Sequence, residues 1–349
     1  MKLAPVARAL LRRHGIEHTI VHTGQHYDRE MSEAFFTQLE IPTPDHNLEV
    51  GSSSHAQQTA TIMQRLEPVL LSENPDVLLV YGDVNSTMAA AIVAAKLGIH
   101  VGHVEAGLRS RDWTMPEEIN RIITDRLSRV LFTPSRDADD NLRHEGVSGN
   151  RIYFVGNVMI DSLVHALPKA RELNAPARFG VEAHHYALVT LHRPSNVDDD
   201  NTLAELLTAL SELAADGPVL FPMHPRTRQR LEGSGFKTPN DLHLLEPVPY
   251  LEMVGLVASA SLVITDSGGL QEETTFLGIP CLTVRSNTER PVTCAIGTNR
   301  LVRPLRADLL AAARNHMPSP LHPPMIERWD GQASERIAQV LCDGATFES

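Results

Sequence analysis

The chain has 349 residues, of which 42% are hydrophobic and 21% are charged, and its formal net charge at pH 7 is −12. This length is too great for one ordinary core and predicts two domains, and the composition is that of a globular protein. The negative charge argues against general nucleic-acid binding, and no apolar run is long enough to span a membrane. Three scattered cysteines without metal or disulfide spacing favour a cytoplasmic location.

Helices and strands are expected to alternate through the first half of the chain. Helices are expected at residues 3–13, 31–38, 55–73, 86–97 and 116–128, with one more before residue 152. Strands are expected at residues 17–22, 76–81, 100–104, 130–133 and 152–155. Because strands that alternate with helices usually form a parallel sheet covered on both faces, residues 1–166 are expected to form a doubly wound, Rossmann-like domain.

Residues 167–185 contain two prolines, one glycine and little periodicity, so we expect them to link the domains. The second half repeats the alternation, and residues 186–325 are expected to form a second Rossmann-like domain. Strands are expected near residues 186–191, 218–223, 242–245, 261–265, 280–284 and 300–303, and helices near 201–215, 249–259, 269–277 and 306–315. Within residues 326–349, a last helix is expected to pack back on the first domain. The predicted fold class is therefore α/β, with two doubly wound domains facing a cleft.

Polar side chains gather at the expected carboxyl ends of strands and at the helix starts that follow. They are Asp83, Glu105 and Glu117 in the first half, and His192, Arg193, His224 and Ser267 in the second. Open α/β sheets bind ligands at this edge. Each residue alone could be a helix cap or an ordinary loop residue, but their joint location favours an active site.

One turn in the second half has the features of a phosphate site. The strand near residues 261–265 ends at Asp266-Ser267-Gly268-Gly269, and a helix follows with Glu272 and Glu273 expected in its first turn. Glycines let backbone N–H groups approach a ligand closely, and a helix N-terminus favours an anion. Phosphate is therefore the first ligand to consider, although a plain turn capped by Ser267 would explain these residues equally well on their own.

Several familiar cofactor motifs are missing from the sequence. There is no Walker loop, dinucleotide-binding fingerprint or nucleophile elbow. His103 and Glu105 match half of a zinc-deaminase motif, but its Pro-Cys-x-x-Cys partner is absent. We therefore expect neither a metal nor another cofactor.

Seven sequence runs carry a resemblance to a known family. They are YGDVNST (81–87), HVEAGLRS (103–110), PEEINR (116–121), VGNVMIDSL (155–163), TLHRPSN (190–196), TDSGGLQEE (265–273) and TERP (288–291). In order and spacing they resemble the non-hydrolysing UDP-N-acetylglucosamine 2-epimerases over nearly the whole chain. The resemblance implies the glycosyltransferase-B fold, a UDP-sugar substrate and a homodimer.

The same resemblance implies a reaction for cell-surface polysaccharide precursor synthesis. That family interconverts UDP-N-acetylglucosamine and UDP-N-acetylmannosamine. In its proposed mechanism UDP leaves C1 as the C2 proton is lost, which gives a 2-acetamidoglucal. UDP then adds back after protonation of the opposite face.

The resemblance also implies roles for individual residues. The acid–base groups would be Asp83, Glu105 and Glu117, and His192 would lie at the diphosphate and the departing oxygen. The phosphate would be held by Ser267, Gly268 and Gly269, and the ribose hydroxyls would donate to Glu273. Further anion or nucleotide contacts would come from Arg193, His224 and Arg290.

The sequence departs from the family pattern at two places. Family members begin with a strand and a Gly-Thr-Arg-Pro-Glu loop before the segment that matches residues 2–5, and this sequence starts just after them. We expect the true start to lie upstream, the alternative being a damaged form with an open slot in its first sheet. Pro194-Ser195-Asn196 stands where many members have Arg-Glu-Asn or Arg-Glu-Ser, which leaves the sugar substituents open.

Four other activities remain compatible with these residues. They are epimerisation of a related UDP-diacetamido sugar, a hydrolysing 2-epimerase reaction, glycosyl transfer by an enzyme of the same fold, and nucleotide-sugar binding without catalysis.

Overall fold

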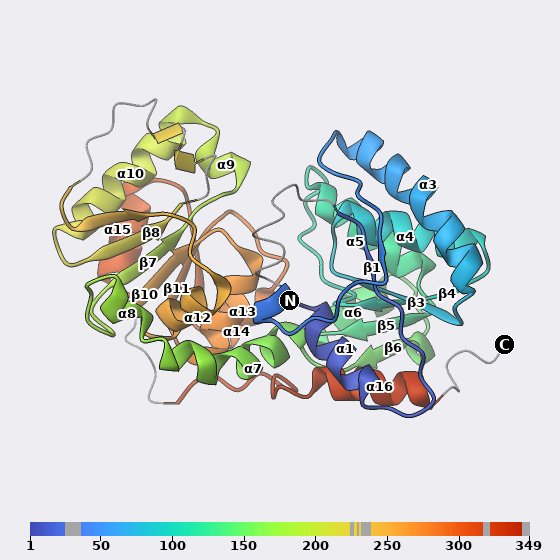
Figure 1. Cartoon of the computed structure of the whole chain (residues 1–349). Coiled ribbons are helices and arrows are strands. Elements are labelled where there is room, and N and C mark those ends of the chain that lie inside the picture. The colour runs from blue at the N-terminus through green and yellow to red at the C-terminus, as the bar shows by residue number, and fades with distance from the viewer. Residues whose placement is uncertain (25–35, 224–226, 229, 232–238, 317–321, 344–349) are drawn as a thin grey trace. The chain divides into compact units, whose positions relative to one another are not determined.

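The computed structural model describes residues 1–24, 36–223, 227–228, 230–231, 239–316 and 322–343 (Figure 1). The chain divides into two compact units. Unit 1 consists of Met1–Ser162 and Glu327–Ser349, and unit 2 of Leu163–Ile326. The division falls inside helix α7 (Val158–Glu172), upstream of the linker predicted at residues 167–185. That range contains the end of α7 and the short helix α8 (Ala175–Arg178).

The main sheet of unit 1 has four parallel strands in chain order. They are β3 (Val77–Tyr81), β4 (His100–Val104), β5 (Val130–Thr133) and β6 (Ile152–Phe154). A separate parallel pair is formed by β1 (Val21–His22) and β2 (His46–Asn47). Strand β1 covers only the end of the strand predicted at residues 17–22, and most of the helix predicted at 31–38 lies outside the described residues.

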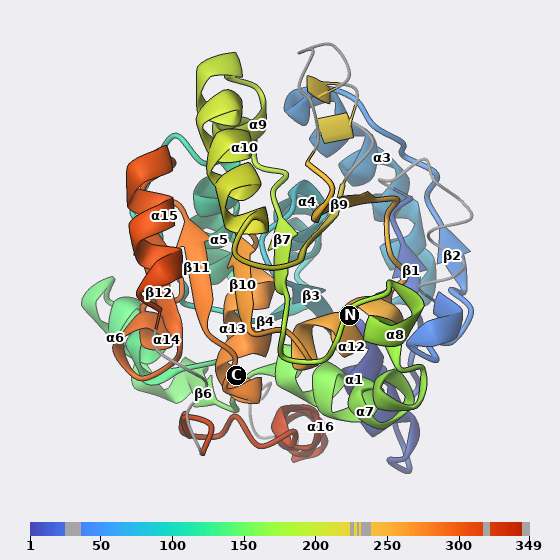
Figure 2. The ribbon, with the colours of Figure 1, turned by 90° about the vertical axis from the view of Figure 1, so that its left-hand side faces the viewer.

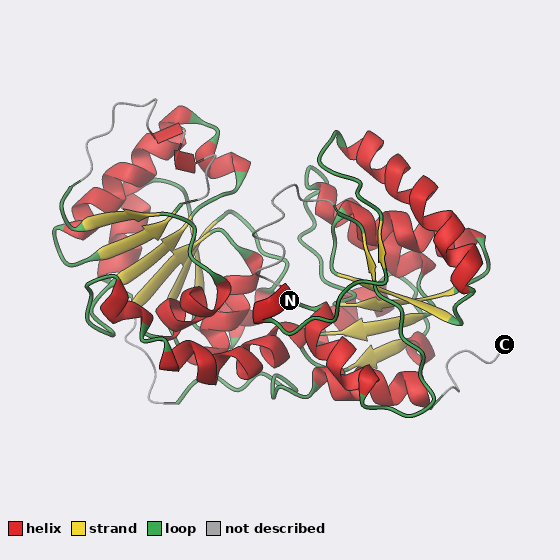
Figure 3. Ribbon diagram, viewed as in Figure 1, coloured by secondary structure: helices red, strands yellow, loops and turns green. Residues whose placement is uncertain are grey.

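Helices surround the strands of unit 1 (Figure 3). They are α1 (Leu3–Leu11), α3 (His55–Glu73), α4 (Asn85–Lys96), α5 (Pro116–Leu127), α6 (Arg136–His144) and α16 (Ala333–Cys342), with a 3₁₀ turn at Gly149–Arg151. The alanine-rich helix α4 buries Ala89, Ala91 and Ala94 completely. Small side chains allow such a helix to approach its neighbours closely.

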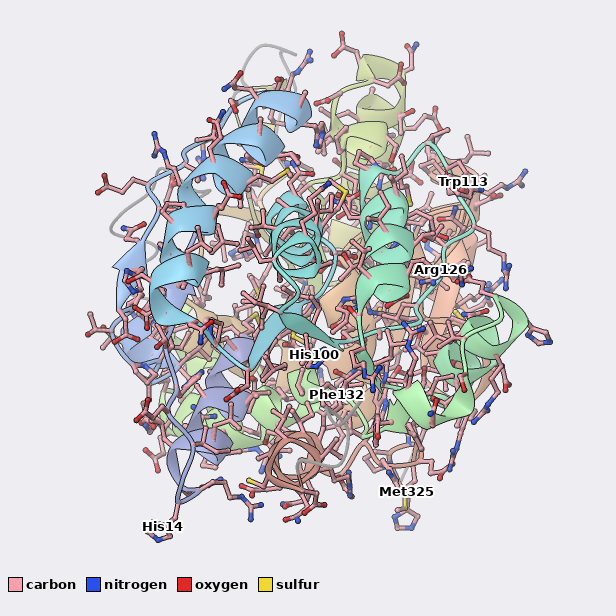
Figure 4. All side chains as sticks on the ribbon, turned by 90° about the vertical axis from the view of Figure 1, so that its right-hand side faces the viewer. His14, His100, Trp113, Arg126, Phe132 and Met325 are labelled. Carbon is pink, nitrogen blue, oxygen red and sulfur yellow. The ribbon has the colours of Figure 1, made fainter. Side chains whose placement is uncertain are left out.

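Apolar cores lie on both faces of the main sheet in unit 1. One core joins Val6 of α1 and Ile337 of α16 to Phe132 of β5. The other joins Leu66 of α3 and Ala91 of α4 to strands β3 and β4. Phe132 lies in the interior, whereas Trp113, with 69% of its surface exposed, lies at the periphery (Figure 4). Helix α16 is therefore part of unit 1.

Unit 2 contains one sheet of six parallel strands. They are β7 (Ala187–Thr190), β8 (Val219–Pro222), β9 (Leu242–Leu245), β10 (Leu262–Thr265), β11 (Cys281–Val284) and β12 (Asn299–Val302). Their order across the sheet is β12-β11-β10-β7-β8-β9, so the direction of winding reverses between β7 and β10 (Figure 2). Ligands of open α/β sheets bind beside such a switch point, at the carboxyl ends of the strands.

The helices of unit 2 cover both faces of this sheet. They are α8, α9 (Pro194–Val197), α10 (Asp200–Ala214), α12 (Tyr250–Ala258), α13 (Gly268–Leu277), α14 (Pro291–Ala295) and α15 (Arg306–Arg314). Along β7, Leu188 belongs to the core under α12 and Val189 to the core under α10 and α15. Because alternate side chains of a strand point to opposite faces, a continuous apolar run is the pattern of a strand buried on both sides.

Both units are α/β with parallel sheets, in agreement with the predicted fold class, and the reversal of a doubly wound sheet is seen in unit 2. The short helix α9 follows the His192-Arg193 segment directly and was not among the predicted elements. Among the described residues, no helix combines the length and apolar character needed to cross a membrane.

Candidate active site

Two of the predicted carboxylates follow neighbouring strands of unit 1. Asp83 comes after β3 and Glu105 directly after β4, and Tyr81 pairs with Val104 where these strands end. Lys2 connects the two turns. Its Nζ donates to Glu105 Oε1 at 2.8 Å, and a Cβ added at Gly82 would lie 2.6 Å from the same nitrogen. Sequence reasoning did not identify Lys2, although this residue opens the segment that matches the family.

Glu105 has an unusual backbone conformation. Its φ of 73° lies in the left-handed region, its N–H donates to the carbonyl of Phe132 at 3.1 Å, and its surface is only 4% exposed. Left-handed conformations cost a non-glycine residue about 1–2 kcal/mol. Such strain persists where the surrounding structure enforces it and is concentrated at functional sites.

Arg121 of α5 holds Asp83 in place. The buried guanidinium contacts Asp83 Oδ2 at 2.5 Å and Glu118 Oε2 at 2.7 Å. Glu118 also accepts the N–H groups of Ser110 and Arg111, at 2.9 and 2.8 Å. Burial alone would raise the pKa of Glu118, but these hydrogen bonds and the charge of Arg121 lower it. Glu118 is therefore an ionised anchor for the loop before α5.

Glu117, the predicted neighbour of Glu118, has a different environment. It is half-buried in the first turn of α5, and within the described part of the chain its carboxylate takes part in no hydrogen bond or ion pair. Adjacent residues of a helix do not share a face. Of the two glutamates, Glu117 is therefore the one whose carboxylate is available to a ligand.

A buried network ties these turns to α5. His103 of β4 is fully buried, and its ring bonds Asp125 Oδ1 at 2.6 Å and the carbonyl of Gly82 at 2.8 Å. Asp125 also accepts the N–H of Gly107 at 3.1 Å and contacts Arg109 at 2.7 Å. Burial opposes ionisation of Asp125, yet His103 and Arg109 lower its pKa. The network thus fixes the turns that carry Asp83 and Glu105.

In unit 2 the predicted His192 lies at the switch point of the sheet. It follows β7, and Asp266 follows the adjacent strand β10, where Thr190 pairs with Thr265. The ring Nδ1 of His192 lies 2.9 Å from Asp266 Oδ1. The Asp266 side chain is completely buried, whereas 52% of the His192 side chain is exposed.

The predicted phosphate turn forms the N-terminus of α13. Ser267 occupies the N-cap position, but its side chain accepts no N–H group of the helix. The alternative prediction, a plain turn capped by the Ser267 side chain, is therefore wrong. Its own N–H donates to Thr265 Oγ1 at 3.0 Å. Ser267, Gly268 and Gly269 are all partly exposed. The start of this ten-residue helix therefore offers N–H donors and the positive end of a dipole to an anion.

The acidic residues of α13 lie deeper than expected. Because the helix begins at Gly268, Glu272 and Glu273 lie in its second turn, and the expectation of acidic residues in the first turn is wrong. Both side chains are buried. Burial, followed by the charge of Glu272, raises the pKa of Glu273 to about 8. Glu273 is therefore largely protonated at neutral pH.

Two predicted arginines also lie beside this turn. Arg290 is buried, contacts Glu272 at 2.7 Å and Glu289 at 2.5 Å, and lies so close to Gly268 that an added Cβ would be 2.5 Å from its guanidinium. Arg193 Nε donates to the carbonyl of Asp266 at 3.1 Å, and its side chain is partly exposed. Both arginines therefore support the turn directly.

Two further expectations concern His224 and metal binding. His224 lies outside the described residues. Among the residues that the structure describes, no group of three or more histidine, cysteine, aspartate or glutamate side chains is arranged to hold a metal ion.

The chain matches a family model described as UDP-N-acetylglucosamine 2-epimerase over residues 8–342. A protein of Methanococcus maripaludis named UDP-N-acetylglucosamine 2-epimerase homolog is 44% identical to this chain, and the match covers 98% of this chain and 96% of the relative's length. UDP-2,3-diacetamido-2,3-dideoxy-D-glucuronate 2-epimerase of Pseudomonas aeruginosa is 42% identical, over 98% of this chain and 96% of the relative's length.

Solved structures agree with this similarity. The crystal structure of Methanocaldococcus jannaschii UDP-GlcNAc 2-epimerase in complex with UDP-GlcNAc and UDP superimposes with a TM-score of 0.90 at 41% identity. The match covers 98% of this chain and 96% of that one. The predicted glycosyltransferase-B type of fold, with two Rossmann-like domains, is confirmed.

Proposed function

Because the chain belongs to the UDP-N-acetylglucosamine 2-epimerase family, we propose that it is a non-hydrolysing isomerase that interconverts UDP-N-acetylglucosamine and UDP-N-acetylmannosamine. The observation that carries the proposal is the set of three acidic residues of unit 1, two of which follow strand ends while the third lies in the first turn of α5. Asp83 is held by Arg121, Glu105 is held by Lys2, and Glu117 is left available.

The chemistry of this reaction requires such a group. The hydrogen on C2 of the sugar is not next to a carbonyl, so direct deprotonation would leave an unstabilised carbanion. Elimination avoids this, since UDP departs from C1 with the electron pair of the C1–O bond while C2 loses its proton. Positioned carboxylates accept and return that proton, and each such step contributes about 10²–10⁴-fold to the rate.

Unit 2 would hold the leaving diphosphate. In this proposal the phosphates lie at Ser267, Gly268 and Gly269, where the α13 N-terminus favours negative charge, and His192 lies at the departing oxygen. UDP must stay bound between elimination and re-addition. The proposal requires one UDP-sugar to contact both units, and the cleft that this implies stays a prediction.

The nucleotide contacts follow from the same placement. Glu273 would accept from the ribose hydroxyls, and Arg193 and His224 would contact the anion or the nucleotide. Arg290 already pairs with two carboxylates, so we expect it to shape the phosphate turn more than to add net positive charge there.

A second candidate substrate is a UDP-diacetamido sugar, because the Pseudomonas aeruginosa relative of that name is 42% identical to this chain. Incubation with each UDP-sugar, followed by NMR of the products, tests both substrates. A UDP-linked manno product supports the proposal. Free sugar plus UDP would identify a hydrolysing enzyme, and an unchanged spectrum with both substrates would contradict epimerase activity.

Glu117→Gln tests the proposed proton transfer. This variant should retain UDP binding and thermal stability but lose epimerisation by about 10²-fold or more, since only the acid–base group is removed. Glu118→Gln is the contrasting variant, because it weakens contacts to Arg121, Ser110 and Arg111 and should lower the melting temperature. If Glu117→Gln turned over like the parent enzyme, its role in proton transfer would be refuted.

We also propose a cytoplasmic location and a homodimer. The first is supported by Cys281, Cys294 and Cys342, which are all free thiols in the structure. Light scattering during size-exclusion chromatography tests the second, because a monomeric mass would contradict it.

A further inference from the structure

We propose that Asp266 is a positioning residue that holds His192 by Nδ1, so that Nε2 is the ring nitrogen presented to the substrate. The inference rests on the function proposed above and adds to it the active nitrogen and the group that selects it. Asp266 belongs to the β10–α13 turn, 74 residues from His192 in the chain.

The dyad joins one buried partner to one exposed partner. Nδ1 of His192 lies 2.9 Å from Asp266 Oδ1, and the Asp266 side chain has no exposed surface. The imidazole, in contrast, is half exposed. With Nδ1 turned to the buried carboxylate, Nε2 is the nitrogen that remains for a ligand.

Asp266 is itself fixed by several donors. Its Oδ2 accepts the N–H of His192 at 3.0 Å, the N–H of Arg193 at 2.9 Å and the side-chain amide of Asn196 at 3.0 Å. Asn196 also donates to the carbonyl of Val284, at the end of β11, at 3.0 Å. These bonds prevent the carboxylate from rotating, so the imidazole plane is set by three neighbouring strand ends.

The charge state of Asp266 determines the tautomer of His192. Burial opposes ionisation, but the hydrogen bond and charge of His192, followed by the Arg193 and Asn196 bonds, lower the pKa of Asp266. An ionised carboxylate only accepts hydrogen bonds, so Nδ1 must carry a proton. A buried carboxylate orients the catalytic imidazole of serine proteases in the same way.

The dyad suits the elimination step. When the C1–O bond breaks, its electron pair moves to the diphosphate oxygen and the C2 proton goes to a carboxylate of unit 1. In the imidazolium form, Nε2–H can donate to that oxygen while Asp266 offsets the ring charge. In the reverse direction the same nitrogen faces the oxygen of UDP that attacks C1.

Two measurements test the inference. The first is the ¹⁵N spectrum of histidine-labelled protein, with the His192 signals assigned by their loss in His192→Gln. Whenever the His192 ring of the parent protein is neutral, we expect its single proton on Nδ1, and the second proton that the elimination step uses then binds at Nε2. The Nε2–H tautomer there would overturn the inference without any variant of Asp266.

The second measurement compares Asp266→Asn with Asp161→Asn. Asp161 is a matched control, because it is also a buried carboxylate that accepts backbone N–H groups, those of Ala333 and Ser334, at 3.1 and 2.7 Å. Both variants should melt at lower temperature. Only Asp266→Asn should lower kcat, by about 10²–10⁴-fold, with the Kd for UDP nearly unchanged.

The outcomes separate this inference from the proposed function. Equal kcat in Asp266→Asn and the parent would refute the positioning role while leaving epimerisation intact. If the parent showed no epimerisation but the Nδ1–H tautomer were present and lost in Asp266→Asn, the dyad would stand and the proposed function would fail. If Asp266→Asn did not fold, the parent ¹⁵N spectrum alone would decide.

Discussion

Replacement of Glu273 by glutamine should change how stability depends on pH. Burial and the charge of Glu272 raise the pKa of Glu273 from an ordinary value of 4.5 to about 8. The unfolded chain would lose this proton near pH 4.5, and the folded protein keeps it until about pH 8. In that window the folded state binds more protons, so the free energy of unfolding falls as pH rises.

The size of the effect follows from the shift. About 3.5 pKa units at 1.36 kcal/mol each give an upper limit of roughly 5 kcal/mol lost across the whole window. Between pH 6 and 8 the loss is about 2 kcal/mol, since the slope flattens as the folded state begins to ionise. The glutamine side chain of Glu273→Gln cannot ionise, so the variant does not lose stability in this way. Its free energy of unfolding should therefore exceed that of the parent by a margin that grows as pH rises.

Thermal unfolding of both proteins from pH 6 to 8 measures this difference. For a unit of this size, about 2 kcal/mol corresponds to a melting temperature difference that grows by roughly 4–8 °C. Glu182→Gln is the control, because it removes an exposed carboxylate of unit 2 and should follow the parent curve. Parallel curves for Glu273→Gln and the parent would refute the raised pKa.

Two further substitutions test the packing of unit 1. Gly156→Ala should lower the free energy of unfolding by about 3 kcal/mol or more, because φ is +93° and the new Cβ would lie 2.0 Å from the carbonyl oxygen of Arg328. In urea titrations, Gly146→Ala, with φ of +82° and open space around it, should cost only about 1–2 kcal/mol, and equal losses would contradict the clash. Lys2→Met removes the cationic partner of buried Glu105, so it should lower the free energy of unfolding by about 1–3 kcal/mol and also reduce kcat. Adding Glu105→Gln to this variant should restore part of the lost stability. If the losses of the two substitutions were fully additive, the ion pair would be contradicted.

Local sequence pattern was sufficient for most elements of both sheets. The apolar runs that became β3 and β10, and the alanine-rich α4, agree with their predicted positions to within a few residues. These elements depend on backbone geometry and on burial within one segment, which nearby residues encode. Residues 167–185 contain more helix than their prolines indicated, because Pro168 lies within α7 and Pro176 lies in the first turn of α8.

The candidate site shows where local pattern stops being informative. Glu117 and Glu118 are adjacent in sequence, and only the structure shows that Glu118 is fully engaged. The same holds for Lys2 beside Glu105 and for Arg121 beside Asp83, which are pairs between segments distant in the chain. The packing of helices against strands determines which of these side chains come into contact.

The sequence by itself determined that this chain has two α/β halves with parallel sheets and belongs to a nucleotide-sugar epimerase family, because short motifs and periodicity can be recognised within a single segment. The tertiary structure alone decided that Asp266 holds His192 and that Glu273 is buried deeply enough to keep its proton near neutral pH. Desolvation and hydrogen-bond geometry come from neighbours far away in the chain, and no local spacing specifies them.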